Sequence, residues 1–70
     1  MPEIIKNSVN QLRLKADVTQ EDFATAIGVT RQTVSAIEKG NYTPSVLLAL
    51  KIARFFKKRV EDIFSITYEK

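Results

Sequence analysis

Residues with hydrogen-bond donors and residues with small side chains lie together near the middle of this 70-residue chain. Arg31 and Gln32 carry the guanidinium and amide groups that match the edges of guanine and adenine in a DNA major groove. Ser35 and Ala36 follow one helical turn later and are small enough for a helix backbone to approach the bases. These types and spacings favour the reading of base edges, with Gln32 as the central residue. Arg31 has a second role open to it, because a phosphate or a neighbouring acid would also bind its guanidinium group.

Four further residues flank this segment and have the chemistry of phosphate contacts. Gln20 is expected in the first turn of the preceding helix, where unpaired backbone N–H groups favour an anion. Lys39, Asn41 and Tyr42 come directly after the base-reading segment and are predicted to bind the sugar-phosphate backbone of double-stranded DNA. The formal net charge of +3 and the isoelectric point of about 9.5 suit a polyanionic partner without requiring one.

The composition excludes most kinds of catalytic and metal chemistry. The chain has no cysteine and no histidine, which removes disulfides, thiolate metal sites and the commonest general base. No cluster of carboxylates suggests a cleft, so we expect no enzyme, no cofactor and no metal site. The apolar run Val46–Leu50 is too short to span a membrane or to act as a signal sequence. We therefore expect a cytoplasmic protein without membrane contact.

The segment of about residues 19–39 predicts two short helices joined by a tight turn. A hydroxyl side chain before each helix suits an N-cap, and a glycine between them suits the left-handed residue that ends a helix. An acid three residues after the first cap suggests a capping box. The residues that mark the pair are the N-cap candidates Thr19 and Thr30, the capping-box partner Asp22, the terminating Gly28 and the inward-facing Val34 and Ile37.

Three more helices are predicted around this pair. Apolar residues at the spacing of one helical face indicate a first helix over about residues 6–15. Ser45 suits the N-cap of a fourth helix that runs to about Phe56, is apolar almost all round and is therefore expected at the centre of the core. A short fifth helix is expected over about residues 60–64. The sequence thus predicts an all-α, five-helix single domain over residues 1–70, with no room for a domain that binds a small-molecule effector.

The two ends of the chain have the composition of short β-strands. Residues 2–5 end in two β-branched isoleucines, and residues 64–69 alternate between apolar and polar types. A ribbon of two strands is marginal in water, so a second copy of the chain would complete it most simply. The residues predicted for this dimer interface are Ile4, Ile5, Phe64, Ile66 and Tyr68. The alternative is that both ends are frayed.

The ordered set of residues around the helix pair resembles the Cro/C1-type (Xre) helix-turn-helix family of phage and bacterial repressors. The resemblance covers about residues 6–64, and it implies a lambda-repressor-like domain of five helices whose third helix reads the major groove, usually as a dimer on a two-fold operator. The matching residues are Thr19-Gln20-Glu21, Ala24, GVTRQ from Gly28, Ile37-Glu38, Pro44-Ser45 and the segments LALKIARFF and EDIF.

The resemblance also implies roles for single residues. The base-reading positions are Arg31, Gln32, Ser35 and Ala36, with Thr43 reaching in from the following loop, and the backbone-contact positions are Gln20, Lys39, Asn41 and Tyr42. Glu38 is implied to pair with Arg13. The chain departs from the family pattern at Lys57, where glycine or asparagine is common, and at Arg59, where a serine or threonine cap is common. Because a missing N-cap costs about 1 kcal/mol, we expect the fifth helix to fray.

Together these observations predict a sequence-specific transcriptional regulator, most simply a repressor that binds an inverted-repeat operator as a homodimer. The alternative is an antitoxin or accessory subunit that acts mainly through a protein partner. A basic cluster follows the fourth helix, and we interpret it as a solvated helix end rather than a second nucleic-acid surface. Its members are Arg54, Lys57, Lys58 and Arg59.

Overall fold

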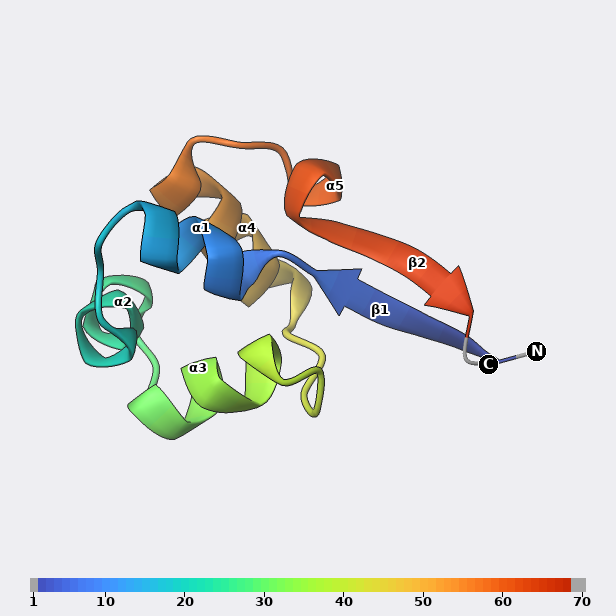
Figure 1. The fold of residues 1–70 in the computed structure, drawn as a ribbon, viewed down its shortest axis with the longest axis horizontal. Coiled ribbons are helices and arrows are strands. Elements are labelled where there is room, and N and C mark those ends of the chain that lie inside the picture. The colour runs from blue at the N-terminus through green and yellow to red at the C-terminus, as the bar shows by residue number, and fades with distance from the viewer. Residues whose placement is uncertain (1, 69–70) are drawn as a thin grey trace.

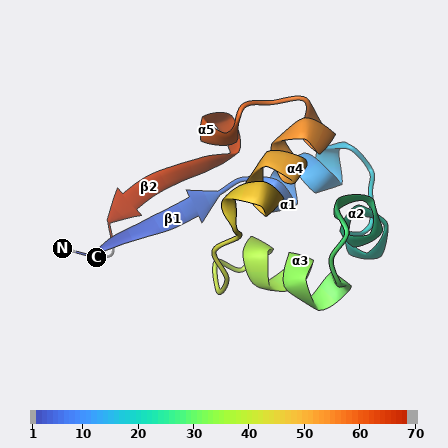
Figure 2. The same ribbon diagram turned by 180° about the vertical axis from the view of Figure 1, so that it is seen from behind.

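A computed structural model describes residues 2–68, which form five helices and a two-stranded antiparallel ribbon (Figure 1). In chain order the elements are β1 (Glu3–Asn7), α1 (Val9–Lys15), α2 (Gln20–Ile27), α3 (Arg31–Glu38), α4 (Val46–Phe56), α5 (Val60–Ile63) and β2 (Phe64–Tyr68). The helices pack into one body, and the ribbon projects from a side of it (Figures 1 and 2). The predicted all-α class is therefore corrected, since the fold is a helical domain with a small sheet built from the two ends of the chain.

The start of three helices follows directly from local sequence. The side-chain oxygens of Thr19, Thr30 and Ser45 each accept the backbone N–H of the residue three positions later, at 3.0, 3.2 and 3.1 Å. Each cap satisfies an otherwise unpaired donor and is worth about 1 kcal/mol. Gly28 ends α2 at a φ of 77°, the left-handed conformation predicted for it. The return bond expected from Asp22 in a capping box is not among the hydrogen bonds of the described residues.

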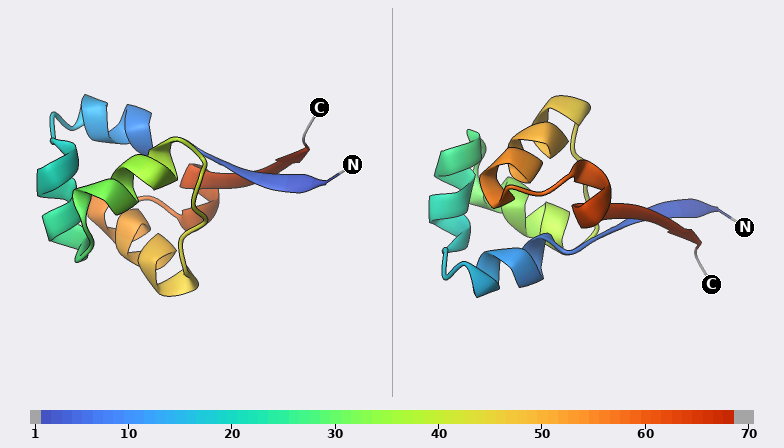
Figure 3. Two further views of the ribbon diagram at one scale, coloured as in Figure 1. Left: turned by 90° about the horizontal axis from the view of Figure 1, so that it is seen from below. Right: turned by 90° about the horizontal axis from the view of Figure 1, so that it is seen from above.

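The core lies between the helices, around the fully buried ring of Phe23. The centroids of the Phe55 and Phe56 rings lie 5.0 and 5.2 Å from that of Phe23, so α2 and α4 meet through a cluster of aromatic side chains. Val34 and Ile37 of α3 are also fully buried, as their spacing predicted. Figure 3 shows α1 and α4 on opposite sides of the body, with α2 across one end and the ribbon at the other. Since α3 buries one stripe, its other side faces outward.

The first helix begins three residues later than predicted. Lys6 and Asn7 belong to β1 and pair with β2, and α1 begins only at Val9. Asn7 lies just before Ser8, the N-cap residue of α1, and its Oδ1 atom accepts the backbone N–H of Val9 at 3.1 Å. The prediction was wrong because pairing with a strand from the far end of the chain satisfies the backbone groups of these residues, and a helical pattern read locally does not detect that partner.

The fourth helix is apolar on both sides, yet only one side is buried. Leu48 and Ile52 face the core, whereas Val46, Leu47 and Leu50 retain 77%, 65% and 54% of their exposure. The fourth helix therefore contributes to the core, as expected, but through one side only. A domain of this size packs α2 and α5 against one side of α4, and none of the elements of residues 2–68 covers the other.

The two strands pair antiparallel, with Ile5 opposite Ile66. Because side chains alternate along a strand, Ile5, Ile66 and Tyr68 share one face of the ribbon and Ile4 lies on the other. These four side chains are 42%, 66%, 60% and 44% exposed in that order, whereas Phe64 packs against the core. The alternative of frayed ends is wrong for β1 and β2. The end of the second strand predicted at residue 69 lies outside the described residues.

The fifth helix is short and has an ion pair at its start. Lys57 adopts the left-handed conformation, at a φ of 56°, that a glycine would take more readily. The backbone N–H of Arg59 donates to Oδ2 of Asp62 at 3.3 Å, and the Arg59 side chain forms an ion pair with the same carboxylate at 3.3 Å. An acid within the helix thus satisfies the backbone N–H of the N-cap residue, although no side chain of residues 2–68 gives the helix N–H groups the acceptor that a hydroxyl cap would provide. The helix nevertheless forms over Val60–Ile63.

Candidate nucleic-acid interface

The outward side of α3 carries the residues predicted to read bases. Arg31 and Gln32 are exposed in its first turn, and Ser35 and Ala36 are half-buried one turn later. Together with two residues beyond the helix they line a shallow hollow, which we call the α3 face. Its residues are Arg31, Gln32, Ser35, Ala36, Lys39 and Asn41. The structure therefore brings four predicted base-reading residues and two predicted backbone contacts onto one surface that contains no acid.

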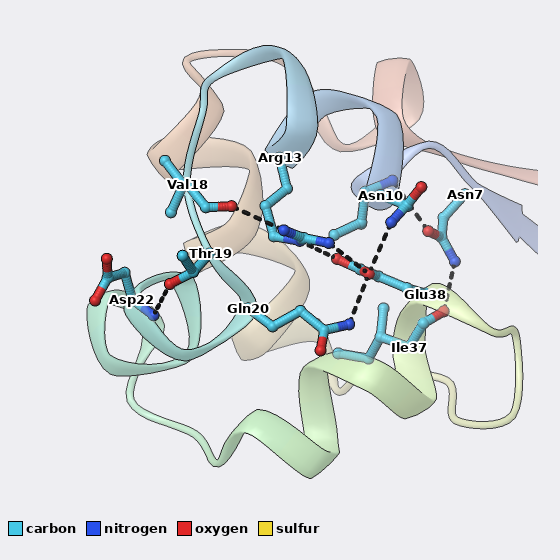
Figure 4. A network of polar contacts seen from close by, with 10 residues as sticks. Asn7, Asn10, Arg13, Val18, Thr19, Gln20, Asp22, Ile37 and Glu38 are labelled. Atoms are coloured by element: carbon cyan, nitrogen blue, oxygen red, sulfur yellow. Dashed lines mark hydrogen bonds and ion pairs between the residues drawn. The ribbon is translucent and has the colours of Figure 1, made fainter.

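The acid of α3, Glu38, is turned away from this surface. Its carboxylate accepts hydrogen bonds from Arg13 Nε at 2.7 Å, Asn10 Nδ2 at 3.0 Å and Gln20 Nε2 at 3.1 Å (Figure 4). The side chains of Arg13 and Glu38 are only 9% and 5% exposed. Donors from α1 and α2 thus hold the C-terminal end of α3 through one carboxylate. This ion pair is the one that the family resemblance implied.

The environment of Glu38 keeps it charged. Burial of the carboxyl group favours its neutral form, but the hydrogen bond from Arg13, followed by those from Asn10 and Gln20, outweighs burial and lowers the pKa of Glu38 below its ordinary value. Glu38 lines the polar hollow beside the α3 face and is not among the residues that line the face itself. The positive and neutral character of that face is therefore maintained at neutral pH.

Gln20 and Lys39, two predicted backbone contacts, lie around a second, polar hollow beside the α3 face. Its lining includes Asn10 and Gln11 from α1 and Ser35 from α3. One N–H of the Gln20 Nε2 group donates to Glu38, so its second N–H and the nearby backbone N–H groups of α2 are what this residue offers to a phosphate. Lys39 is exposed at the rim and offers a full positive charge.

Tyr42 and Thr43 lie in the exposed loop between α3 and α4 and are not among the residues that line the α3 face. Tyr42 instead borders a hollow shared with Leu47 and Lys51 of α4, next to Gly28. The structure therefore groups Tyr42 with the start of α4. It does not bring Thr43 to the base-reading residues in the free protein.

No role was assigned from the sequence to three residues of this region. Asn7, Asn10 and Gln11 were given no role, yet Asn10 bonds to Glu38, Gln11 borders the polar hollow, and Asn7 Nδ2 donates to the carbonyl oxygen of Ile37 at 3.0 Å. A signal was available for Asn10, which lies three residues before Arg13 and therefore on the same side of α1.

Residues 9–63 match the sequence profile of the family described as helix-turn-helix, which is more than half of the chain. The chain belongs to the Cro/C1-type helix-turn-helix family. Membership makes it a DNA-binding regulator of the helix-turn-helix type. The helix pair α2–α3, with Gly28 in the turn, is the motif that gives this family its name.

Relatives from distant organisms share most of the chain. It is 51% identical over 65 residues to the uncharacterized HTH-type transcriptional regulator YgzD of Bacillus subtilis, covering 93% of this chain and 98% of the relative. It is 53% identical over 60 residues to the uncharacterized HTH-type transcriptional regulator MJ0272 of Methanocaldococcus jannaschii, covering 86% and 91%. A more distant relative is the cryptic phage CTXphi transcriptional repressor RstR of Vibrio cholerae, 31% identical over 62 residues, or 89% of this chain and 56% of that protein.

Two further observations bear on the kind of site this is. Among residues 2–68, no group of three or more acidic residues is placed to hold a metal ion. No helix in the same range is long and apolar enough to cross a membrane.

Proposed function

We propose that the chain is a sequence-specific repressor that binds double-stranded DNA as a homodimer on an inverted-repeat operator. The observation that carries the proposal is the exposed, acid-free α3 face, which presents Arg31 and Gln32 at the first turn of a helix held by its buried side. Arginine and glutamine are the side chains that bind guanine and adenine edges through paired hydrogen bonds. Ser35 and Ala36 let the helix lie close to the bases.

The phosphate contacts proposed here lie around this face. Lys39 and Asn41 border it directly, and Gln20 reaches it from the first turn of α2. Tyr42 belongs to the exposed loop after α3 and lies beside the groove once α3 is inserted in it, whereas Thr43 of the same loop is proposed to reach a base edge. Contacts of this kind set the register of the helix on DNA, whereas Gln32 and Arg31 supply the sequence preference.

The ribbon is the surface proposed for dimerisation. Ile5, Ile66 and Tyr68 form an exposed apolar row on one face, with Ile4 on the other and Phe64 at the base. Strands of five residues cannot bury such side chains by themselves, and a free strand edge readily pairs with another chain. A second copy provides both the missing edge and an apolar face of the same kind.

The dimensions of the molecule support such a dimer. A strand of five residues spans roughly 17 Å, so the helical body takes up about 19 Å of the long axis of 36 Å (Figure 1). If two ribbons lie side by side over their full length, the centres of the two bodies are roughly 36 Å apart. Successive turns of a major groove on one side of DNA are about 34 Å apart. The two α3 helices can therefore enter adjacent turns of one groove.

Repression is the sign of regulation that we propose. A reading domain joined to a dimer ribbon acts most simply by occupying a promoter. The relative from Vibrio cholerae is named a transcriptional repressor, which agrees with this proposal at 31% identity.

Two experiments test the proposal together. One selects bound sequences from a random pool of double-stranded DNA, and the other measures the mass of the protein in solution. We expect an inverted repeat whose half-sites are centred about 10–10.5 base pairs apart, bound by a dimer. Gln32→Ala should lose preference at one base position, at a cost of about 1–3 kcal/mol for the correct base. The exposed Lys15→Ala variant, changed at the far end of α1, is the control and should select the same sequence. Binding without any enriched sequence would contradict the proposal.

A further inference from the structure

The ribbon joins the helical body without a linker on either strand. Asn7 ends β1 and Val9 begins α1, while β2 starts directly after Ile63 of α5. The single residue between β1 and α1, Ser8, donates its backbone N–H to the carbonyl oxygen of Ile63 at 3.0 Å. The two connections are thus tied to each other. A ribbon attached in this way has little freedom to swing relative to the helices.

Asn7 lies at this junction and bonds to two helices at once. Its Oδ1 atom accepts the backbone N–H of Val9, at 3.1 Å, and its Nδ2 atom donates to the carbonyl oxygen of Ile37, at 3.0 Å. That carbonyl belongs to the last turn of α3 and also accepts the backbone N–H of Gly40. One half-buried side chain therefore connects the end of β1, the start of α1 and the end of the base-reading helix (Figure 4).

The contact from Asn7 is continued by the next turns of α1. Asn10 and Arg13, three and six residues later, donate to the Glu38 carboxylate. The continuous segment β1–α1 therefore holds the C-terminal end of α3 at Ile37 and Glu38. Of these three side chains, Asn7 is the one that belongs to the ribbon.

We propose that Asn7 is a positioning residue that couples the ribbon to α3, so that pairing of two ribbons sets the separation and tilt of the two base-reading helices. The inference rests on the proposed dimer and its inverted-repeat operator. In this arrangement the dimer discriminates between operators by the spacing of their half-sites. When that spacing changes, the major groove of one half-site moves, and a rigid connection between the ribbon and α3 keeps α3 from following it. Removal of the Asn7–Ile37 bond loosens that connection without altering the bases that α3 reads.

Asn7→Ser separates the two bonds. A serine hydroxyl can still accept the N–H of the residue two positions later, as in a serine turn, but it is too short to reach the carbonyl of Ile37. The change adds no charge that would repel DNA. Ser8→Ala is the matched control at the same junction, because the Ser8 side chain makes no capping bond. Asn7→Asp is a second variant of the same shape that keeps the acceptor and loses the donor.

The decisive measurement compares the affinity for the selected operator with the affinities for altered operators. The altered operators have one or two base pairs added or removed between the half-sites. For Asn7→Ser we expect the ratio between correct and altered spacing to fall about 2- to 10-fold, the range that one hydrogen bond supports. The dimer mass and the penalty for a mismatched base should stay as in the wild type. Ser8→Ala should keep the full spacing ratio. An equal loss of affinity at every spacing, or no change at all, would overturn the coupling.

Hydrogen exchange in the free protein gives a readout that needs no DNA. We expect the backbone amides of Gly40 and Asn41, which bond to the last turn of α3, to exchange about 2- to 10-fold faster in Asn7→Asp and Asn7→Ser. Unchanged exchange in both variants would overturn the role of Asn7. A wild type that selects no operator is a different outcome, because that defeats the proposed function before any variant is compared.

Discussion

Arg13 is the buried cation on which the end of α3 depends, and Arg13→Met tests how much the domain needs it. Methionine keeps an apolar stem of similar reach but removes the donors to Glu38 and the bond from Nη1 to the carbonyl oxygen of Val18, which is 2.8 Å long. The Glu38 side chain is 5% exposed, so its carboxylate cannot turn to water unless α3 moves. The variant leaves a buried charge with two neutral donors, Asn10 and Gln20.

The expected loss is large compared with the total stability. Removing one partner of a buried ion pair costs about 3–5 kcal/mol. Because Asn10 and Gln20 still donate to Glu38, we expect a value near the lower end, about 3 kcal/mol. A domain of 70 residues has a free energy of unfolding of about 3.5–10 kcal/mol at the usual stability per residue. Arg13→Met should therefore lose between a third and nearly all of its stability.

Urea unfolding followed by far-ultraviolet circular dichroism measures this loss, with Glu38→Gln and the double variant beside it. Glutamine removes the buried charge, so the double variant should be more stable than Arg13→Met by about 1–2 kcal/mol, a clear departure from additivity. Arg59→Met is the control, because the Arg59–Asp62 pair is 75% and 44% exposed and its loss should not shift the unfolding midpoint measurably. A loss under about 1 kcal/mol in Arg13→Met, or strictly additive effects, would refute this account of Glu38.

Three further predictions follow from particular residues. The pKa of Glu38 is lowered in the folded state, so its ionised carboxylate contributes fully to the free energy of unfolding above the ordinary pKa of 4.5. This contribution is lost as the pH falls through the folded pKa. The urea midpoint should therefore decline on acidification below pH 4.5, and it should decline less steeply in Glu38→Gln. Lys39→Ala should weaken binding to all DNA sequences and reduce the slope of log affinity against log salt by about 0.9, whereas Lys15→Ala should leave the slope unchanged. Lys57 has a φ of 56°, a left-handed conformation that glycine adopts without strain, so Lys57→Gly should stabilise the domain by about 0.5–1 kcal/mol in thermal unfolding. The neighbouring Lys58→Gly is the control and should give no gain in stability.

The helix pair could be predicted from the sequence because its signals are local. Each N-cap hydroxyl lies three residues from the N–H group that it accepts, and Gly28 supplies the left-handed turn without any distant contact. The inward stripe of α3 follows from the spacing of Val34 and Ile37 in the same way. The surface left over by that stripe is the α3 face, so the candidate site followed from the same pattern. Its contacts with DNA remain predictions.

The features that the sequence did not predict depend on residues far apart in the chain. Lys6 and Asn7 fit a helical pattern until β2 is available to pair with them. The outward aliphatic side chains of α4, such as Leu50, read as core because apolar type alone does not show which neighbour is close enough to cover them. The spacing of Asn10 from Arg13 places the two on one side of α1, but the partner that gives Asn10 its role, Glu38, is 28 residues away.

Gln20 shows how one side chain can serve both the fold and the site. Its amide donates to Glu38, which ties the first turn of α2 to the end of α3, and the same turn presents backbone N–H groups that favour a phosphate. A phosphate contact through the amide N–H that now bonds to Glu38 would break that bond, whereas a contact through the second amide N–H or the backbone N–H groups would not. Since Arg13 and Asn10 already satisfy the carboxylate, release of Gln20 to DNA would cost little. The network around Glu38 can therefore keep α3 in place while one of its donors turns to the DNA backbone.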